Sequence, residues 1–321
     1  EMITVLAFYV FSRHEIDVAI VEVGLGGRLD ATNVISPLVS VITSVGLDHQ
    51  QYLGSTLADI AREKGGIIKR GVPVVVGQMD TESSKVIEDI ASRQNCRTVS
   101  HGIAFHSRGD VGSDFSYVGT EMCYDRLRLG LKGRFQIRNA SVAIAALECI
   151  KGRFPVPPSA IRGGLKSVSY PGRFECVSSE PLVILDGAHN IQALRTLIEE
   201  VQLCYHDKRF CFLFGVMQDK TWGPMLSAIE KVAHRVVFTA VNQPRAENPG
   251  RLQAAFSRGV SSEVHYGAVS ACKQMLTTVN SADVLVVCGS LFLVGEVLPL
   301  FQGTYQKLLD CCETSQTEQG N

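Results

Sequence analysis

Mainly apolar runs of strand length alternate with segments of helical periodicity in the first half of the chain. Residues 17–23, 38–45 and 72–76 are such runs. Strands that are buried on both faces of a parallel sheet have this pattern. Residues 56–68 and 84–93 instead carry apolar side chains at helical spacing. The pattern predicts a parallel sheet with helices between its strands.

The pattern weakens before it ends in a strong helix. Residues 98–132 are expected to hold only short β-like pieces, such as residues 115–118 and 127–131. Residues 139–150 are rich in alanine and contain no Gly or Pro, which predicts a helix.

A stretch rich in proline and glycine separates the two halves of the chain. It covers residues 151–173, with room for one short helix at residues 159–165. Such punctuation is typical of a boundary between domains. We therefore expect a first domain over residues 1–168 and a second over residues 169–321.

The second half repeats the alternation of strands and helices. Strands are predicted at residues 182–185, 210–214, 235–240 and 284–288. Helices are predicted at residues 191–204, 224–233, 251–257 and 269–279. This order indicates a Rossmann-like α/β domain, although the glycine fingerprint for dinucleotides is missing.

Composition narrows the function classes. The 321 residues suffice for about two domains. The net charge of -1 and the scattered basic residues speak against nucleic-acid binding. No apolar run reaches the roughly 18–20 residues of a membrane span. The ten cysteines form no Cys-x-x-Cys pair, which favours reduced thiols in a cytosolic protein over disulfides or zinc.

A glycine-rich segment follows the first apolar run. Residues 22–33 read EVGLGGRLDATN, so that Glu22 stands at the predicted carboxyl end of a strand. Ligands bind at that edge of open α/β sheets, and glycines let backbone amides approach an anion. A tight turn with a solvated Glu22 explains the same residues.

Two further segments carry candidate chemistry. Asp48 and His49 follow the second apolar run, where they could bind a cation or orient a phosphate. They also suit a helix N-cap followed by a half-exposed histidine. Lys64 precedes two glycines at the end of a predicted helix, where its charge would also favour the helix dipole.

Together these segments resemble the central domain of folylpolyglutamate and dihydrofolate synthases, which are ligases of the Mur type. The resemblance rests on the order of the glycine-rich segment, the Asp-His pair and the EKGGIIK segment at residues 63–69. Four more motifs agree with that family: RNAS at 138–141, PGR at 171–173, LDGAHN at 185–190 and GSLFLVGE at 289–296. The resemblance covers nearly the whole chain.

The resemblance implies a Mur-ligase-like central nucleotide-binding domain, followed by a Rossmann-like C-terminal α/β domain. The family's phosphate loop, of the Gly-x-x-Gly-Lys-Gly-Ser/Thr kind, does not occur in these residues. The chain also opens within a helical pattern at Glu1. We therefore expect the segment with that loop to be missing, and the 321 residues alone to bind ATP poorly and to lack ligase activity.

The resemblance also assigns roles in the central domain. Glu22 and His49 match the family's magnesium ligands, and Lys64 matches a lysine that is carbamylated in this family. A carbamate would turn this cation into an anion beside the metal. Asn139 matches a residue at the adenine of ATP.

In the second domain, Arg173 matches an arginine that reaches the ATP phosphates, while Asp186 and His189 match residues that face the nucleotide. We expect Lys64, Arg173, Asp186 and His189 to be catalytic. The implied reaction joins L-glutamate to a folate carboxylate through an acyl phosphate, with ATP and Mg²⁺. Positioning and charge neutralisation carry most of such a reaction.

The sequence specifies the acceptor substrate, the cellular location and the partners less tightly than the class of reaction. We favour tetrahydrofolate and its polyglutamates as the acceptor, with dihydropteroate or both acceptors as alternatives. A ligase acting on a cell-wall precursor and a catalytically dead homologue are other possibilities. We expect a cytoplasmic monomer, or a mitochondrial form in a eukaryote, with small-molecule substrates and no nucleic-acid or membrane partner.

Overall fold

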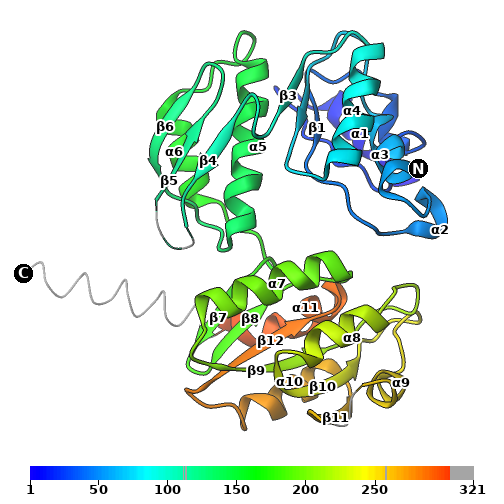
Figure 1. Cartoon of the computed structure of the whole chain (residues 1–321), viewed down its shortest axis with the longest axis vertical. Coiled ribbons are helices and arrows are strands. Elements are labelled where there is room, and N and C mark those ends of the chain that lie inside the picture. The colour runs from blue at the N-terminus through cyan, green and yellow to red at the C-terminus, as the bar shows by residue number, and fades with distance from the viewer. Residues whose placement is uncertain (111, 113, 257–258, 304–321) are drawn as a thin grey trace, which may run out of the picture. The chain divides into compact units, whose positions relative to one another are not determined.

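The computed structural model describes residues 1–110, 112, 114–256 and 259–303. The chain divides into two compact units (Figure 1). Unit 1 holds residues 1–129 and 135–167, and unit 2 holds residues 130–134 and the chain from residue 168 onward.

Unit 1 contains a small parallel sheet with the strand order β1-β2-β3. The strands are β1 (Ser40–Ile42), β2 (Val74–Val76) and β3 (Thr98–Ser100). Helices α3 (Leu57–Gly65) and α4 (Thr81–Arg93) pack against each other, and their apolar residues share a core cluster with β1 and β2. The uniformly buried side chains of β2 agree with a central strand that is covered on both faces.

The first apolar run does not form the strand that its composition predicts. Residues 17–23 belong to no described strand, and Ile20 is 97% exposed. An apolar run becomes a strand only where a neighbour accepts its backbone hydrogen bonds, and no described strand pairs with this segment. Helix α1 (Met2–Arg13) likewise buries none of its residues.

Unit 1 also contains an antiparallel sheet with two helices, besides a 3-10 helix at Ala31–Val34 and the short helix α2 at Gln50–Leu53. The strands of this sheet are β4 (His106–Arg108), β5 (Phe115–Val118) and β6 (Cys123–Leu127), in that order. Helices α5 (Arg134–Ile150) and α6 (Pro158–Ser167) share a core cluster with these strands. The prediction for residues 115–118 is confirmed, whereas that for 127–131 is wrong because β6 ends at Leu127.

Unit 2 is built on a six-stranded sheet with the order β11-β10-β9-β12-β8-β7. All neighbours are parallel except β7 and β8. The strands are β7 (Glu175–Ser179), β8 (Leu182–Leu185), β9 (Arg209–Phe214), β10 (Ala233–Ala240), β11 (Ser261–Tyr266) and β12 (Asp283–Cys288). The helices are α7 (Ile191–Cys204), α8 (Gly223–Glu230), α9 (Pro249–Ala254), α10 (Ala268–Leu276) and α11 (Leu291–Val297).

The core of unit 2 follows the two-residue period of its strands. Alternate side chains of the central strands share one core cluster with α10 and α11, as Leu213 and Val287 do. The intervening side chains, such as Phe212 and Val286, are equally buried and point to the opposite face. Helices therefore cover both faces of the sheet, which leaves its strand ends as the open edges.

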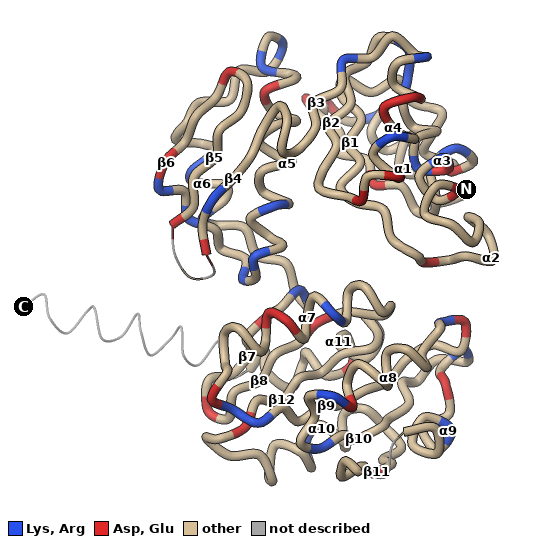
Figure 2. The backbone as a smooth tube through the Cα atoms, viewed as in Figure 1, with Lys and Arg blue, Asp and Glu red and all other residues tan. Residues whose placement is uncertain are grey.

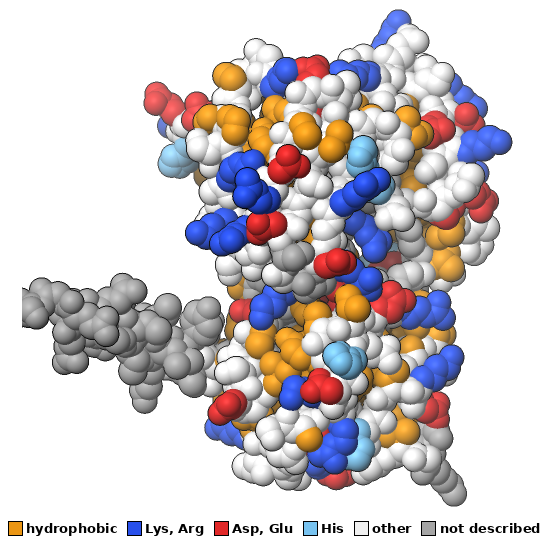
Figure 3. All heavy atoms as spheres, turned by 60° about the vertical axis from the view of Figure 1, so that its left-hand side comes forward, with side chains coloured by type: hydrophobic (Ala, Val, Ile, Leu, Met, Phe, Trp, Pro, Cys, Tyr) orange, Lys and Arg blue, Asp and Glu red, His pale blue; other side chains and the backbone are white. Residues whose placement is uncertain are grey.

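Charges of both signs are interspersed along both units (Figure 2). The face in Figure 3 likewise mixes acidic, basic and hydrophobic side chains. Within the described residues, no helix is both long and apolar enough to cross a membrane.

Candidate functional site

The glycine-rich segment of unit 1 is a loop that Asp30 closes. One Asp30 oxygen accepts hydrogen bonds from the amides of Gly24 and Leu25, each at 3.0 Å. The other accepts from the amide of Thr32 at 2.9 Å and from its hydroxyl at 2.5 Å. Burial raises the pKa of Asp30, but these hydrogen bonds outweigh burial and lower it. An ionised carboxylate therefore holds the loop shut.

This loop packs against the last turn of α3. The amide of Arg28 donates to the carbonyl of Glu63 at 2.8 Å, and the two side chains form an ion pair at 2.9 Å. A Cβ at Gly66 would collide with the Cα and Cβ of Arg28, and one at Gly27 would lie 2.8 Å from the Glu63 carbonyl oxygen. Glycine at both positions allows this close approach.

Lys64 lies on the same turn of α3 and is half-buried. Burial lowers the pKa of its ammonium, and the negative charge of Asp48 acts in the opposite direction. Asp48 also accepts a hydrogen bond from the amide of His49 at 2.8 Å. The Asp-His pair and the EKGGIIK segment are therefore close enough to interact electrostatically in the folded unit.

His49 is the N-cap of α2 (Gln50–Leu53) and has a left-handed backbone, with φ 50°. A non-glycine residue in this region is uncommon and marks a constrained position. The same short helix carries Leu53, whose side chain would lie 2.8 Å from a Cβ at Gly26. The Asp48–His49 turn is thereby joined to the glycine loop.

Glu22 and Asn139 complete the residues expected in unit 1. Glu22 is exposed and precedes Gly24, the first residue that Asp30 ties down. Asn139 is exposed in the second turn of α5, where its side chain donates to Gln136 at 3.0 Å. Both side chains are accessible to a ligand from solvent.

The described residues of unit 1 offer oxygen and nitrogen donors for the expected metal. Among the residues described, no three His, Cys, Asp or Glu side chains gather as a ligand cluster. Mg²⁺ needs no such cluster, because it is commonly held by one or two protein ligands together with phosphate oxygens and water. A carboxylate such as Glu22 and an imidazole such as His49 are single donors of the kind that such an open site uses.

In unit 2, Asp186 ties two segments of backbone together. Its oxygens accept hydrogen bonds from the amide of Phe174 at 2.7 Å and from that of Ala188 at 2.8 Å. The amide of Gly187 also donates to the carbonyl of Gly172 at 2.9 Å. Burial raises the pKa of Asp186, and the two amides act against that rise. Through these contacts, the Asp186 carboxylate holds in place the segment that contains Arg173.

Arg173 is presented by a constrained turn. Gly172 and Phe174 on either side have left-handed backbones, with φ 69° and 48°, and Phe174 is buried. The Arg173 guanidinium lies 5.7 Å from the centre of the Tyr170 ring. A Cβ at Gly187 would lie 2.9 Å from a guanidinium nitrogen, so the arginine lies directly over the loop after β8. Arg173 and Asp186 are thus brought together.

His189 lies at the other end of this loop. Its Nδ1 is 2.9 Å from the carbonyl oxygen of Gly187, which orients the ring. Asn190 follows as the N-cap of α7 and accepts from the amide of Ala193 at 2.9 Å. Glu175, which the sequence did not single out, accepts from the amide of Gly172 at 2.7 Å. Its only sequence signal was its closeness to the PGR motif.

Both units match known domain families. The Mur ligase middle domain matches residues 2–147, and the Mur ligase, glutamate ligase domain matches residues 172–291. The chain is therefore built from domains of Mur-type ligases.

Similarity to individual proteins shows which kind of Mur-type ligase this is. The dihydrofolate synthase/folylpolyglutamate synthase of Bacillus subtilis is 34% identical over 316 residues, which are 92% of this chain and 70% of the relative. Its Escherichia coli counterpart is 31% identical over 295 residues, 92% of this chain and 67% of the relative. A structure of Mycobacterium tuberculosis folylpolyglutamate synthase complexed with ADP and AMPPCP has a TM-score of 0.86 at 30% identity, covering 94% of this chain and 72% of that one. The chain belongs to the folylpolyglutamate synthase/dihydrofolate synthase family, which is a family of ligases.

Proposed function

We propose that this protein ligates L-glutamate to the γ-carboxylate of tetrahydrofolate and its polyglutamates at the expense of ATP. The observation that carries the proposal is the turn in which Asp186 holds Arg173 over the loop after β8. It places a permanent cation at the carboxyl edge of a parallel sheet, where ligands of such sheets bind.

The proposed role of unit 1 is to hold ATP and a divalent cation. A related structure from Yersinia pestis is complexed with AMPPNP and a Mn ion, which supports a nucleotide–metal site. Glu22 and His49 would bind the cation, which supplies charge neutralisation at the phosphates. Asn139 would contact the adenine.

Lys64 is proposed to act as a carbamate in unit 1. A carbamate forms when a neutral amine adds CO₂ and loses a proton, so a lowered pKa favours it by raising the fraction of neutral amine. Burial lowers the pKa of Lys64 in this way. The resulting anion would support a cation bound nearby.

The proposed reaction has two steps. An oxygen of the folate carboxylate attacks the γ-phosphorus of ATP, which forms an acyl phosphate and releases ADP. The neutral amine of glutamate then attacks the acyl carbon and loses one proton as the amide forms, and phosphate leaves with the former carboxylate oxygen. Arg173 would neutralise charge that develops on the transferred phosphoryl group, and His189, oriented by the Gly187 carbonyl, would face the reacting groups.

The choice of acceptor is tested by offering tetrahydrofolate and dihydropteroate in parallel to the full-length gene product with ATP and labelled glutamate. Incorporation into tetrahydrofolate alone is expected. Incorporation into dihydropteroate would make the protein a dihydrofolate synthase or a bifunctional enzyme, and relatives carry both names. The Arg173→Ala variant is expected to lose about 100-fold in kcat. Incorporation into neither acceptor would refute the proposal.

A further inference from the structure

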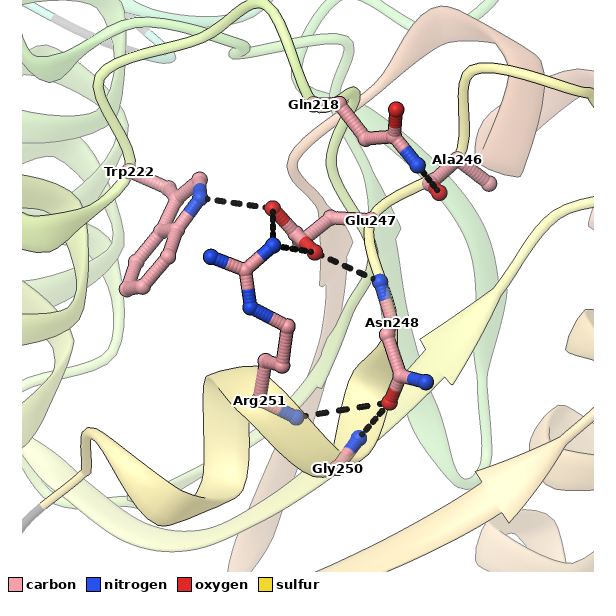
Figure 4. A network of polar contacts seen from close by, with 7 residues as sticks. All are labelled: Gln218, Trp222, Ala246, Glu247, Asn248, Gly250 and Arg251. Atoms are coloured by element: carbon pink, nitrogen blue, oxygen red, sulfur yellow. Dashed lines mark hydrogen bonds and ion pairs between the residues drawn. The ribbon is translucent and has the colours of Figure 1, made fainter.

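Glu247 is a buried carboxylate that the proposed reaction does not use. It lies between β10 and α9 and is 3% exposed. Its side chain accepts from the indole N–H of Trp222 at 3.1 Å, from the guanidinium of Arg251 at 3.1 Å and from the amide of Asn248 at 2.8 Å (Figure 4). These donors come from the loop after β9, from α9 and from its own loop. Glu247 therefore joins three segments.

The loops that follow β9 (residues 215–222) and β10 (residues 241–248) are hydrogen-bonded to each other. The backbone amide of Gln218 donates to the carbonyl oxygen of Arg245 at 2.8 Å. The side-chain amide of Gln218 donates to the carbonyl oxygen of Ala246 at 3.0 Å (Figure 4). We call them the paired loops. Glu247 fixes both, because it binds an indole on one and belongs to the other.

The paired loops lie at the edge of the sheet that also holds Asp186. Strands β8, β12, β9 and β10 are mutually parallel neighbours, so the loops after them share one edge. Backbone hydrogen bonds link these loops along the edge. The amide of Gly289 donates to the carbonyl of Ala188 at 2.9 Å, and the amide of Gly215 donates to the carbonyl of Cys288 at 3.3 Å. A Cβ at Gly289 would lie 2.6 Å from the Gly215 carbonyl oxygen, which shows how closely these loops approach.

The paired loops carry cationic side chains, which are the kind that recognise carboxylates. Lys220 and Arg245 are cationic, and Arg245 lies 3.5 Å from Asp219 in an ion pair. We propose that Glu247 is a positioning residue that sets the affinity for the glutamate substrate, an inference that rests on the proposed function. It does so by fixing the paired loops at this edge of the sheet. It acts through the loops and does not touch the substrate.

A purely structural role is the competing explanation, and the chain offers a matched control for it. Asp283 is 4% exposed and is bound by the guanidinium of Arg209 at 2.8 Å and by the amide of Asn280 at 3.0 Å. Asp283 is the first residue of β12, whereas Glu247 lies in the loop between the end of β10 and the start of α9. Breaking either buried ion pair costs stability, but only Glu247 is at the proposed substrate edge.

The test compares wild type, Glu247→Gln, Glu247→Ala and Asp283→Asn in the full-length gene product. Steady-state rates are measured against glutamate and separately against ATP, together with Tm and with hydrogen exchange of the amides of the paired loops. Glu247→Ala is expected to raise KM for glutamate by about tenfold with kcat and KM for ATP little changed. Glu247→Gln, which keeps one acceptor for the indole, is expected to restore part of that loss.

Exchange in the paired loops should rise in Glu247→Ala and stay at the wild-type level in Asp283→Asn. Equal effects of the two alterations on KM for glutamate would overturn the inference, as would unchanged exchange in Glu247→Ala. A wild-type protein that incorporates no glutamate would refute the proposed function and the substrate role of Glu247 with it. The exchange data would still decide whether Glu247 fixes the loops, so the two failures are distinguishable.

Discussion

Replacing Asp186 with asparagine tests directly how the Arg173 turn is held. The carboxylate accepts from the amides of Phe174 and Ala188 at 2.7 and 2.8 Å. Asparagine has nearly the same size but offers one acceptor and one donor. One of the two buried amides therefore loses its partner in Asp186→Asn.

The expected loss follows from two opposing contributions. A hydrogen bond to a charged acceptor contributes about 1.5–3 kcal/mol to the free energy of unfolding. Burial raises the pKa of Asp186, so the wild-type carboxylate carries a desolvation cost that asparagine avoids. We expect a net loss of about 1–2 kcal/mol. At about 2–4 °C per kcal/mol for a unit of the size of unit 2, its Tm should fall by roughly 2–8 °C.

Activity should fall further than stability explains, because the Asp186 carboxylate binds the amide of Phe174, whose left-handed backbone at φ 48° is costly for a non-glycine residue. A released turn would let Arg173 leave its place over Gly187. Thermal unfolding, hydrogen exchange of the Phe174 and Ala188 amides, and kcat are to be measured beside Asp283→Asn. Unchanged exchange at both amides in Asp186→Asn, or a loss of kcat no greater than in the control, would refute the reasoning.

Three further predictions concern unit 1. In ¹³C-bicarbonate, the wild type should show a carbamate resonance that Lys64→Ala lacks; the same resonance in both proteins would contradict the assignment. The lowered pKa of Asp30 means that its stabilisation is present above its ordinary value of 3.8 and is lost as the pH falls through the folded-state value. Asp30→Asn should therefore lower Tm near neutral pH and matter little in strong acid, and an equal effect at both would count against this. Gly66→Ala should lower the free energy of urea unfolding by about 1–3 kcal/mol, because the added Cβ collides with Arg28. Gly164→Ala has open space around the added Cβ in α6 and should raise that free energy by about 0.5–1 kcal/mol. Equal effects of the two substitutions would exclude the steric cause.

Central strands and long helices could be predicted because their apolar pattern is local. Strand β8 and helix α7 have the predicted ends. Strands β7 and β11 were not predicted, since both lie at the edges of their sheet and their polar residues break the apolar run. The prediction for residues 17–23 failed for the converse reason, because apolar composition does not supply a pairing partner.

For the site, as for the fold, residues in local motifs could be predicted, whereas contacts between distant segments could not. Sequence motifs singled out Lys64 and Asp186, and the structure adds what surrounds each of them. That Asp186 holds the Phe174 amide, and that Glu247 ties the loops after β9 and β10, depends on hydrogen bonds between segments distant in the chain. No local pattern carries such contacts, because they exist only once the sheet has aligned its strand ends.

The measurement that tests the central claim most directly follows the oxygen of the acceptor carboxylate. The folate substrate is labelled with ¹⁸O in its γ-carboxylate, and the full-length gene product turns it over with ATP and glutamate. If the reaction passes through an acyl phosphate, each inorganic phosphate released carries one ¹⁸O atom. Arg173→Ala should then slow the appearance of labelled phosphate and of ligated product together. Product formed with unlabelled phosphate would contradict the account.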